Sequence, residues 1–382
     1  MQNVGEAWLM MDLTKSPLPV AMLSTAFVGA SLFAMLPAGV LADRVDRRKV
    51  AFASQVVQVI AALAMAVASY TGHITPGALV FGVALLGIGM ALGAPAWAAL
   101  IPELVPREMV AEAIALNAVA FNLARAVGPA IGGLVLARFG ATTSFLLNAA
   151  SFGVVMIALV MVRVAVPPRS ASPASVRPLA SAFVEPWRVV MREADVRLPF
   201  VGMFGFSMGA GIFYALTPSF AKESLGATPL GYGVMIGALG GGAVLGASVI
   251  KRLRGRLHPR FLVAGTMFTF ATFIAIVSRV DSVPVVMALL VPAGAGWLGS
   301  FSSLSALTQI WTPERLRARV VALYQMAHLG TWAIASATGG VLADRFGIRA
   351  AMTTGAVVCA VAALSTWKLG LPRDFRGPAP PG

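Results

Sequence analysis

Residues 39–49 read GVLADRVDRRK and join two long apolar stretches, at 18–42 and 50–72. About 20 apolar residues are enough for a helix to cross a bilayer, so each stretch can span a membrane once. Basic residues gathered in the short polar turn between them favour a turn at the membrane surface. The segment therefore predicts a hairpin of two transmembrane helices.

The same alternation of apolar stretches and short polar turns continues to the end of the chain. Further spans are predicted at 76–100, 109–137, 142–164, 196–221, 229–250, 260–279, 283–310, 316–342 and 350–370. With the first two, these make eleven full spans. The opening stretch MQNVGEAWLMMDL is apolar but too short to cross, so it predicts the second half of a first helix whose start is missing. TKSPLP at 14–19 supplies the following turn.

Composition supports an all-α polytopic membrane protein. Of the 382 residues, 58% are hydrophobic and 12% charged, and the mean hydropathy is +0.84. Soluble domains have about 45–50% apolar and about 25% charged residues, which excludes an ordinary soluble enzyme. The net charge of +14 is spread in clusters between apolar stretches, which argues against nucleic acid as a partner. A single cysteine excludes a disulfide framework.

Loop charges fix the predicted orientation. With the N-terminus in the cytoplasm, 22 Lys and Arg residues fall inside and six outside, and Arg125 lies within a span. Cytoplasmic loops of membrane proteins are enriched in Lys and Arg. We therefore expect a multi-pass protein of the inner (plasma) membrane, with both termini and the 165–195 loop in the cytoplasm.

The segment 165–195 is the one long polar connection. Its first part is rich in Pro and Ser, and its second part places apolar and charged side chains on opposite faces of a helix. This pattern predicts an interfacial amphipathic helix, with a solvated linker as the alternative. It divides the chain into an N-terminal helix bundle at 1–164, the linker at 165–195, a C-terminal bundle at 196–370 and a disordered cytoplasmic tail at 371–382.

An internal repeat relates the two bundles. An offset of 207 aligns the span at 109–137 with that at 316–342, and it also carries Arg47 onto Arg254. One offset that fits two distant places predicts two homologous, pseudo-symmetric halves of six helices. GVLADR recurs at 39–44 and 340–345, as expected of smaller inverted repeats within each half. Such repeats, with a site near the midplane, are the plan of an alternating-access carrier.

Four segments of the sequence resemble motifs of a known protein family. GVLADRVDRRK at 39–49 resembles the signature between the second and third helices of the major facilitator superfamily. NLARAVGPAIGG at 122–133 resembles the helix-five motif of its efflux members. WLMMDLTKSPLPVAML at 8–23 and IPELVP at 101–106 resemble the drug:proton antiporter group that includes the enterobactin exporter and transmembrane secretion effector proteins. The resemblance covers essentially the whole chain and implies a twelve-helix carrier that exports small molecules against a proton gradient.

Three features depart from the family pattern. Half of the first helix is missing, Asp46 replaces the usual glycine of the loop signature, and Trp97 follows Ala94-Pro95-Ala96 where relatives often carry arginine. The last difference puts any charge relay through that arginine in doubt.

The resemblance assigns a gating role to the loop signature. Asp43 ends a helix among basic residues, and a carboxylate there can accept hydrogen bonds from a neighbouring helix N-terminus and clamp one half against the other. The predicted gating residues are Gly39, Asp43, Arg44, Arg47 and Arg48. The alternative is a basic loop that only sets the topology.

Two stripes of side chains are predicted to face a central substrate cavity. Asn117, Phe121 and Arg125 share one face of a helix because they are four residues apart. The offset of 207 matches them with a second stripe, made of Tyr324, His328 and Trp332. A charge inside a membrane costs about 2.5–3.5 kcal/mol and usually faces a cavity or a partner. The alternative is that Arg125 ties helices together while the aromatic rings pack in the core.

The candidates for proton coupling are Glu6, Asp12 and His328. Glu6 falls near mid-membrane if about a half-helix precedes it, Asp12 lies nearer the outer surface, and His328 titrates in a useful range. A lone histidine in a span also fits a structural, hydrogen-bonded role. Close helix packing is predicted at Gly128, Pro129, Gly132 and Gly133, and at the run 237–246, which also fits static packing.

We expect a monomeric, proton-coupled exporter of small amphipathic molecules or of a secreted metabolite such as a siderophore. Its partners are the lipid bilayer, the substrate and protons. No catalytic motif or metal-ligand spacing is present in the sequence, and no cofactor is expected. A lipid or solute uptake carrier of the same fold and a non-transporting membrane scaffold stay open. The sequence specifies neither the substrate nor the protonated residue.

Overall fold

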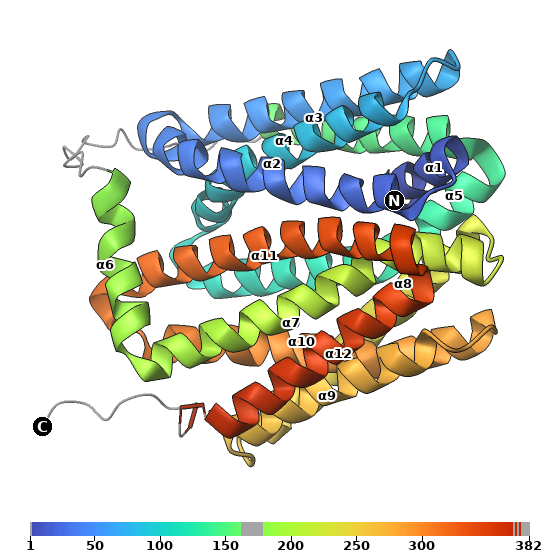
Figure 1. The fold of residues 1–382 in the computed structure, drawn as a ribbon. Helices are drawn as coiled ribbons and strands as arrows, with labels where there is room; N and C mark the ends of the chain where they lie inside the picture. The colour runs from blue at the N-terminus through green and yellow to red at the C-terminus, as the bar shows by residue number, and fades with distance from the viewer. Residues whose placement is uncertain (1, 162–178, 370, 373, 376–382) are drawn as a thin grey trace, which may run out of the picture. The chain divides into compact units, whose positions relative to one another are not determined.

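The computed structural model describes residues 2–161, 179–369, 371, 372, 374 and 375 (Figure 1). Every secondary-structure element in these residues is helical. The chain divides into two compact units, Met1–Ser170 with Thr217–Gly237 (unit 1) and Ala171–Leu216 with Ala238–Gly382 (unit 2). Nine helices of the described part are long and apolar enough to cross a membrane. The predicted all-α membrane fold is confirmed.

Unit 1 contains the first five long helices, and their starts follow local sequence signals. Pro17 stands in the first turn of α2, where its missing N–H costs nothing. The side chains of Asp46 and Thr75 cap α3 and α4 by accepting backbone N–H groups of the first turn. The helices are α1 (Gln2–Thr14), α2 (Pro17–Arg44), α3 (Arg47–Tyr70), α4 (Pro76–Leu100) and α5 (Val110–Met161).

Helix α5 comprises two antiparallel segments divided at Gly140. A straight helix of its 52 residues would be about 78 Å long, more than twice the thickness of about 30 Å that a bilayer core offers. Gly140 breaks the helix with a φ of +78°, a conformation that favours glycine. Beyond this break the chain returns, and Leu159 accepts a hydrogen bond from Arg48 at the start of α3. The two segments match the spans predicted at 109–137 and 142–164.

Unit 2 repeats the packing pattern of unit 1. Helix α9 packs against α10 and α12, as α3 packs against α4 and α5. This equivalence agrees with the repeat at an offset of 207. The remaining helices are α6 (Leu179–Arg192), α7 (Ala194–Ser219), α8 (Pro229–Arg254), α9 (Pro259–Val277), α10 (Val283–Trp311), α11 (Arg317–Phe346) and α12 (Ile348–Leu369). The last residues of α7, the short π-helix Phe220–Ser224 that follows it and the start of α8 as far as Gly237 belong to unit 1.

Helix α6 occupies the second part of the predicted linker and lies crosswise to α7 and α11 (Figure 1). Its Val190 is buried against Leu316 and Val320 at the start of α11. The carboxylate of Glu185 lies 3.2 Å from Arg319 and 3.9 Å from Arg315. The opposite face, which includes Trp187 and Met191, is exposed. Residues 165–178 of the predicted linker lie outside the described residues.

The predicted disordered tail at 371–382 is described only in part. Leu371 is buried, and the Trp311 Nε1–H donates to the carbonyl oxygen of Asp374 over 3.1 Å. These contacts hold the described part of the tail against α10. Residues 376–382 lie outside the described residues.

Glycines allow close approach of backbones in both units. A Cβ on Gly133 would collide with the carbonyl oxygen of Pro229, and one on Gly233 with that of Pro129. In unit 2, a Cβ on Gly242 would collide with the Val291 backbone. Small residues commonly bring membrane helices this close. Pro129 and Gly133 therefore lie at a tight contact between backbones.

Candidate functional site

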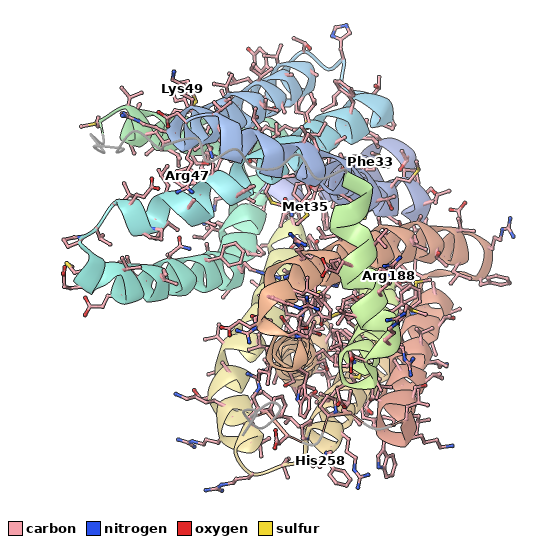
Figure 2. All side chains as sticks on the ribbon, turned by 90° about the vertical axis from the view of Figure 1, so that its left-hand side faces the viewer. Phe33, Met35, Arg47, Lys49, Arg188 and His258 are labelled. Carbon is pink, nitrogen blue, oxygen red and sulfur yellow. The ribbon has the colours of Figure 1, made fainter. Side chains whose placement is uncertain are left out.

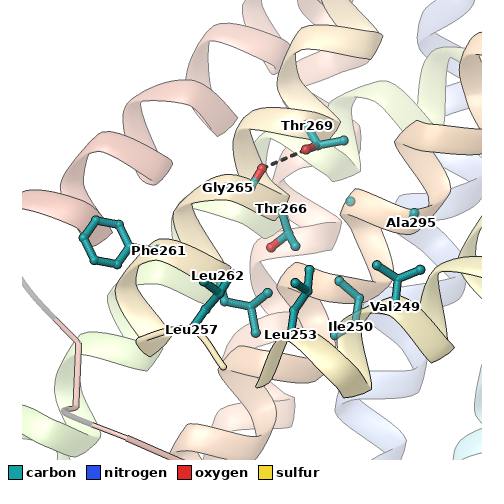
Figure 3. Close-up of a pocket in the computed structure, with 11 residues that line it drawn as sticks. Val249, Ile250, Leu253, Leu257, Phe261, Leu262, Gly265, Thr266, Thr269 and Ala295 are labelled. Atoms are coloured by element: carbon teal, nitrogen blue, oxygen red, sulfur yellow. Dashed lines mark hydrogen bonds between the residues drawn. The ribbon is translucent and has the colours of Figure 1, made fainter. Parts of the chain in front are cut away.

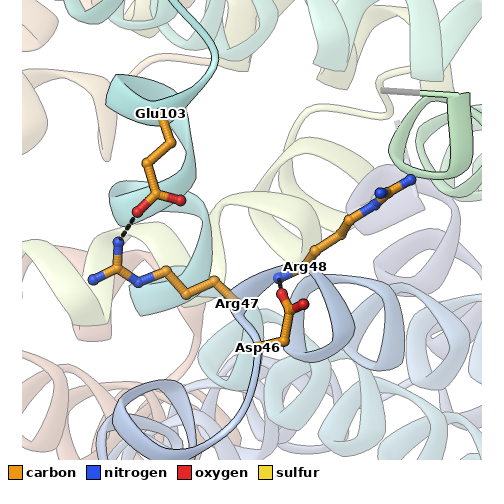
Figure 4. Close-up of polar contacts among 4 residues, drawn as sticks. All are labelled: Asp46, Arg47, Arg48 and Glu103. Carbon is orange, nitrogen blue, oxygen red and sulfur yellow. Dashed lines mark hydrogen bonds and ion pairs between the residues drawn. The ribbon is translucent and has the colours of Figure 1, made fainter. Parts of the chain in front are cut away.

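The turn between α2 and α3 is braced by its own charged residues (Figure 4). The Asp46 carboxylate accepts the backbone N–H of Arg48 over 2.8 Å. Arg47 forms an ion pair with Glu103, which follows α4. Arg48 donates to the carbonyl oxygens of Leu159 and Val160, each over 2.6 Å. The turn thus joins α3 to the ends of α4 and α5.

Three of the predicted gating residues cannot be placed in this network. Gly39, Asp43 and Arg44 belong to the C-terminal part of α2, and the surroundings of these three residues lie outside what the structure describes. Figure 2 shows Arg47 and Lys49 at the N-terminal end of α3. The network shows that Arg47 and Arg48 stabilise the turn within unit 1, and a gating role for the five residues stays a prediction.

The stripe predicted on α5 is present on one exposed face. The Arg125 guanidinium lies 5.7 Å from the centre of the Phe121 ring, a cation–π contact. Phe121 is 60% exposed, and Asn117, one turn earlier, is also exposed. A guanidinium that stacks on an aromatic ring is able to bind an anionic or polar group on its open side. The stripe therefore offers one cationic and one aromatic surface next to each other.

Unit 2 holds a cluster of rings from three helices, which we call the aromatic cluster. Trp332 of α11 lies 5.3 Å from Trp297 of α10 and 5.7 Å from Tyr214 of α7, measured between ring centres. His328 is 5.7 Å from Trp332 and 5.2 Å from Phe301. These five side chains are only partly buried. Partly open indole and phenol rings suit the binding of planar or apolar groups.

The second predicted stripe does not act as one surface. His328 and Trp332 belong to the aromatic cluster, whereas Tyr324 is 1% exposed and packs edge-on against Phe200 at 5.1 Å. The His328 Nδ1 lies 2.7 Å from the Ser207 hydroxyl of α7. This hydrogen bond positions the imidazole. It agrees with the alternative that a lone histidine in a span has a structural, hydrogen-bonded role.

Sequence reasoning missed the other members of the aromatic cluster. Tyr214, Trp297 and Phe301 lie on α7 and α10, outside α5 and α11, the two helices that carry the predicted stripes. The available signal was weak: Trp297 stands between Gly294 and Gly299, whose lack of side chains allows α10 to approach α8 and α9. A large ring in such a glycine-rich stretch points to a surface built for aromatic contact.

Glu6 lies in a buried polar group between α1 and α5. Its carboxylate accepts the side-chain N–H of Gln2 over 2.6 Å, and Gln2 in turn accepts a hydrogen bond from Asn148. Glu6 is 5% exposed. Of these two amides only Gln2 bonds to Glu6, and Asn148 holds Gln2 in place.

Asp12 has a different environment. It forms an ion pair with Lys222 of the π-helix, and the Lys222 ammonium lies 5.0 Å from the centre of the Trp8 ring. The Asp12 side chain is 56% exposed. An exposed carboxylate that already has a cationic partner is better suited to hold α1 in place than to carry a proton through the membrane. Among the described residues, no group of three or more His, Cys, Asp or Glu side chains is placed to hold a metal ion.

Comparison with known proteins gives a consistent result. A family profile described as transmembrane secretion effector matches residues 1–375. The enterobactin exporter EntS of Citrobacter koseri is 27% identical over 372 residues, which cover 94% of this chain and 85% of that protein. The exporter of the same name from Escherichia coli O1:K1 / APEC is 27% identical over 371 residues, with 94% and 82% covered.

Solved transporter structures share the fold at low sequence identity. The nucleoside transporter NupG, solved as a variant, superposes with a TM-score of 0.77 at 11% identity and covers 96% of both chains. An inward-facing bacterial homologue of the human lysosomal transporter Spinster gives 0.75 at 14% identity, with 96% and 93% covered. The inward-open xylose transporter XylE from E. coli gives 0.72 at 14%, with 96% and 92% covered. At such identities the likeness establishes the fold alone.

Proposed function

Because this chain belongs to the transmembrane secretion effector family of the major facilitator superfamily, we propose that it exports small amphipathic molecules or a secreted metabolite by alternating access. We further propose that export is driven by proton antiport across the plasma membrane. The named function of its curated relatives, enterobactin export, supports export over uptake.

The observation that carries the proposal is the exposed guanidinium of Arg125. It lies in Leu123–Met161, a stretch apolar enough to cross the membrane. Exposing a charge to hydrocarbon costs about 2.5–3.5 kcal/mol even on the lenient scale, so Arg125 is expected to face water or a ligand. With Phe121 beside it, Arg125 can bind a molecule that has both a polar or anionic group and an apolar body.

The aromatic cluster of unit 2 supplies a second surface for the same class of substrate. Trp297 and Trp332 are partly open and make ring contacts on several sides, which fixes their orientation. Fixed rings lose little conformational entropy when they bind an apolar group. We therefore assign the cluster, with the stripe of Asn117, Phe121 and Arg125, to substrate binding.

Glu6 is the residue to which we assign proton coupling. Burying a charged carboxylate costs several kcal/mol, and the side-chain hydrogen bond that Glu6 accepts comes from the neutral amide of Gln2. A carboxyl in this position exchanges a proton when water or a cation reaches it. We rank it above Asp12, which is paired with Lys222, and above His328, which is bonded to Ser207.

We also propose that the α2–α3 turn gates transport and that both termini and the 165–195 loop are cytoplasmic. Replacing Asp43 by Asn is then expected to reduce turnover more than substrate affinity. Normal turnover in Asp43→Asn, measured in proteoliposomes, would remove Asp43 from the gate.

The function is tested by accumulation of a fluorescent amphipathic compound in efflux-deficient cells. Cells that produce the protein are expected to accumulate less compound, and a protonophore is expected to restore accumulation. Arg125→Ala, checked for membrane insertion, serves as the inactive control. Purified protein in proteoliposomes with an imposed pH gradient then tests coupling directly, and Glu6→Gln is expected to retain substrate binding but lose dependence on the gradient. Gradient-independent movement by the wild-type protein would overturn proton antiport.

A further inference from the structure

An apolar groove lies between α8, α9 and α10 in unit 2 (Figure 3). Its volume is about 300 Å³. A second hollow of about 280 Å³ continues along α8 and α10 and shares Val249, Ile250 and Ala295 with the first. The remaining walls of the first groove are mostly aliphatic, with residues Leu253, Leu257, Phe261, Leu262, Gly265, Thr266, Thr269 and Gly296.

The two hydroxyl groups in the wall are already satisfied. Thr266 donates to the carbonyl oxygen of Val263 over 3.0 Å, and Thr269 donates to that of Gly265 over 2.8 Å. The groove therefore presents little hydrogen-bonding capacity to a ligand. From Phe261 to Thr269 along α9 it extends about 12 Å, close to the ~15 Å of one leaflet of the bilayer core. These dimensions suit an acyl chain.

The end of the groove at Leu257 and Phe261 is strongly basic. Arg260 stacks on Phe261 with its guanidinium 4.6 Å from the ring centre. Residues Lys251, Arg252 and Arg256 are exposed at the same turn, and no acidic residue occurs from 251 to 280. Figure 2 shows His258 at this turn.

His258 adds no positive charge to this end near neutral pH. Burial lowers the pKa of His258, the neighbouring Arg260 lowers it further, and Asp374 acts in the opposite direction. The His258 Nδ1 instead accepts the backbone N–H of Arg260 over 3.3 Å and caps α9. The arginine and lysine side chains therefore determine which headgroup is preferred.

We propose that this groove binds one acyl chain of an anionic phospholipid, whose phosphate is held by Arg260 and the exposed basic side chains of the α8–α9 turn. Each part of the ligand meets a matching surface, because the chain lies along an apolar wall and the phosphate reaches several cations. The proposal requires a membrane-spanning unit 2 and does not depend on transport or on the identity of the cargo.

The first variant fills the groove without disturbing the helices. A Cβ added to Gly265 would meet no atom within 4 Å, so the side chain of Gly265→Leu extends into the groove. Gly241 of α8 is equally free of neighbours and lies outside the wall of the groove, so Gly241→Leu is the matched control. The full-length protein is titrated with phosphatidylglycerol or phosphatidylcholine in detergent, and bound lipid is counted by native mass spectrometry.

The wild-type protein and Gly241→Leu are expected to bind phosphatidylglycerol more tightly than phosphatidylcholine. Gly265→Leu is expected to weaken phosphatidylglycerol binding about tenfold, as displacement of two methylene groups from the groove would. Equal binding of both lipids by the wild-type protein, or unchanged binding by Gly265→Leu, would overturn the proposal.

Arg260→Gln tests the headgroup separately and replaces a surface side chain, which keeps folding intact. It is expected to reduce the preference for phosphatidylglycerol about fivefold, the effect of one basic residue at a membrane surface. An unchanged preference would remove Arg260 from the site, and an unchanged preference after joint neutralisation of Arg252, Arg256 and Arg260 would overturn the headgroup assignment. Because the readout is lipid binding, it separates this proposal from the proposed export activity.

Discussion

The two basic turns of the molecule occupy equivalent places in the repeat but are stabilised by different chemistry. Arg47 of unit 1 pairs with the carboxylate of Glu103. Its counterpart Arg254 donates to the hydroxyls of Ser302 and Ser303, over 2.7 and 3.3 Å, and lies 5.5 Å from the Phe375 ring. One arginine is neutralised within its unit, while the other is held by groups without charge.

A similar difference recurs inside the spans. The offset of 207 matches Arg125 on α5 with Trp332 on α11, so unit 1 has a cation where unit 2 has an indole. The two units thus share the packing of their helices and differ in side-chain chemistry. Unit 1 is suited to bind charge, and unit 2 to bind rings and to leave its basic turn available for other anions.

Removing the cation from the stripe of unit 1 is expected to have the largest effect. Arg125→Ala should reduce protonophore-sensitive efflux about tenfold to a hundredfold, because a hydrogen bond to a charged group contributes about 1.5–3 kcal/mol. Arg125→Lys, which keeps the charge, should retain part of the activity. Wild-type efflux by a well-inserted Arg125→Ala protein would show that the charge of unit 1 is not used.

Truncating the matched indole of unit 2 is expected to have a smaller effect, mainly on affinity. Trp332→Ala should raise the KM for an aromatic substrate about tenfold, because an aromatic contact contributes about 0.5–1.5 kcal/mol beyond the free energy of burying its apolar surface. Trp332→Phe keeps a ring and serves as the control. Transport kinetics in proteoliposomes measure both, and a change in kcat alone would argue against substrate contact.

The two basic turns are compared directly through stability. Arg47→Ala leaves the partly buried Glu103 carboxylate without its cation and should lower the free energy of unfolding by about 1–2 kcal/mol. Arg254→Ala leaves only hydroxyls, which can bond to nearby carbonyl groups, so its effect should be smaller. Thermal unfolding in detergent measures both variants. If the double variant with Arg47→Glu and Glu103→Arg regains the wild-type stability, the ion pair is the cause of the loss. Equal losses of stability in Arg47→Ala and Arg254→Ala would contradict the difference between the two turns.

The smallest effect is expected at the exposed ion pair of α6. Glu185→Gln removes the charge that faces Arg315 and Arg319, and exposed pairs contribute about 0–1 kcal/mol. The midpoint of thermal unfolding should therefore change little. Val190→Ala, which removes a buried contact with α11, should destabilise the protein more. The reverse order would show that charge rather than apolar packing holds α6 in place.

The spans could be read from the sequence because the bilayer imposes their length and apolarity. The break between the spans at 109–137 and 142–164 contains Gly140, the residue at which the structure reverses α5. The repeat also indicated which face of α5 corresponds to which face of α11. These are properties of single helices or of pairs related by the offset.

The neighbours of each site residue could not be read in the same way. Tyr214 and Trp297 meet Trp332 from other helices, and Asn148 reaches Gln2 across 146 positions. Such contacts depend on helix rotation and spacing, which apolar patterns alone do not specify. Tyr324 shows the limit, since it shares a helical face with His328 and yet packs in the interior.

Helix α11 has a consequence for how the chain enters the membrane. It has 30 residues, but it is not among the helices apolar enough to cross on composition alone, because Gln325, His328 and Thr331 interrupt its apolar residues. Insertion of each helix from the translocon depends on its own hydrophobicity. Helix α11 is therefore expected to integrate only when α12, which follows it after one residue, is synthesised and can pack against it. We expect a chain that stops before α12 to insert α11 less efficiently than the full chain does.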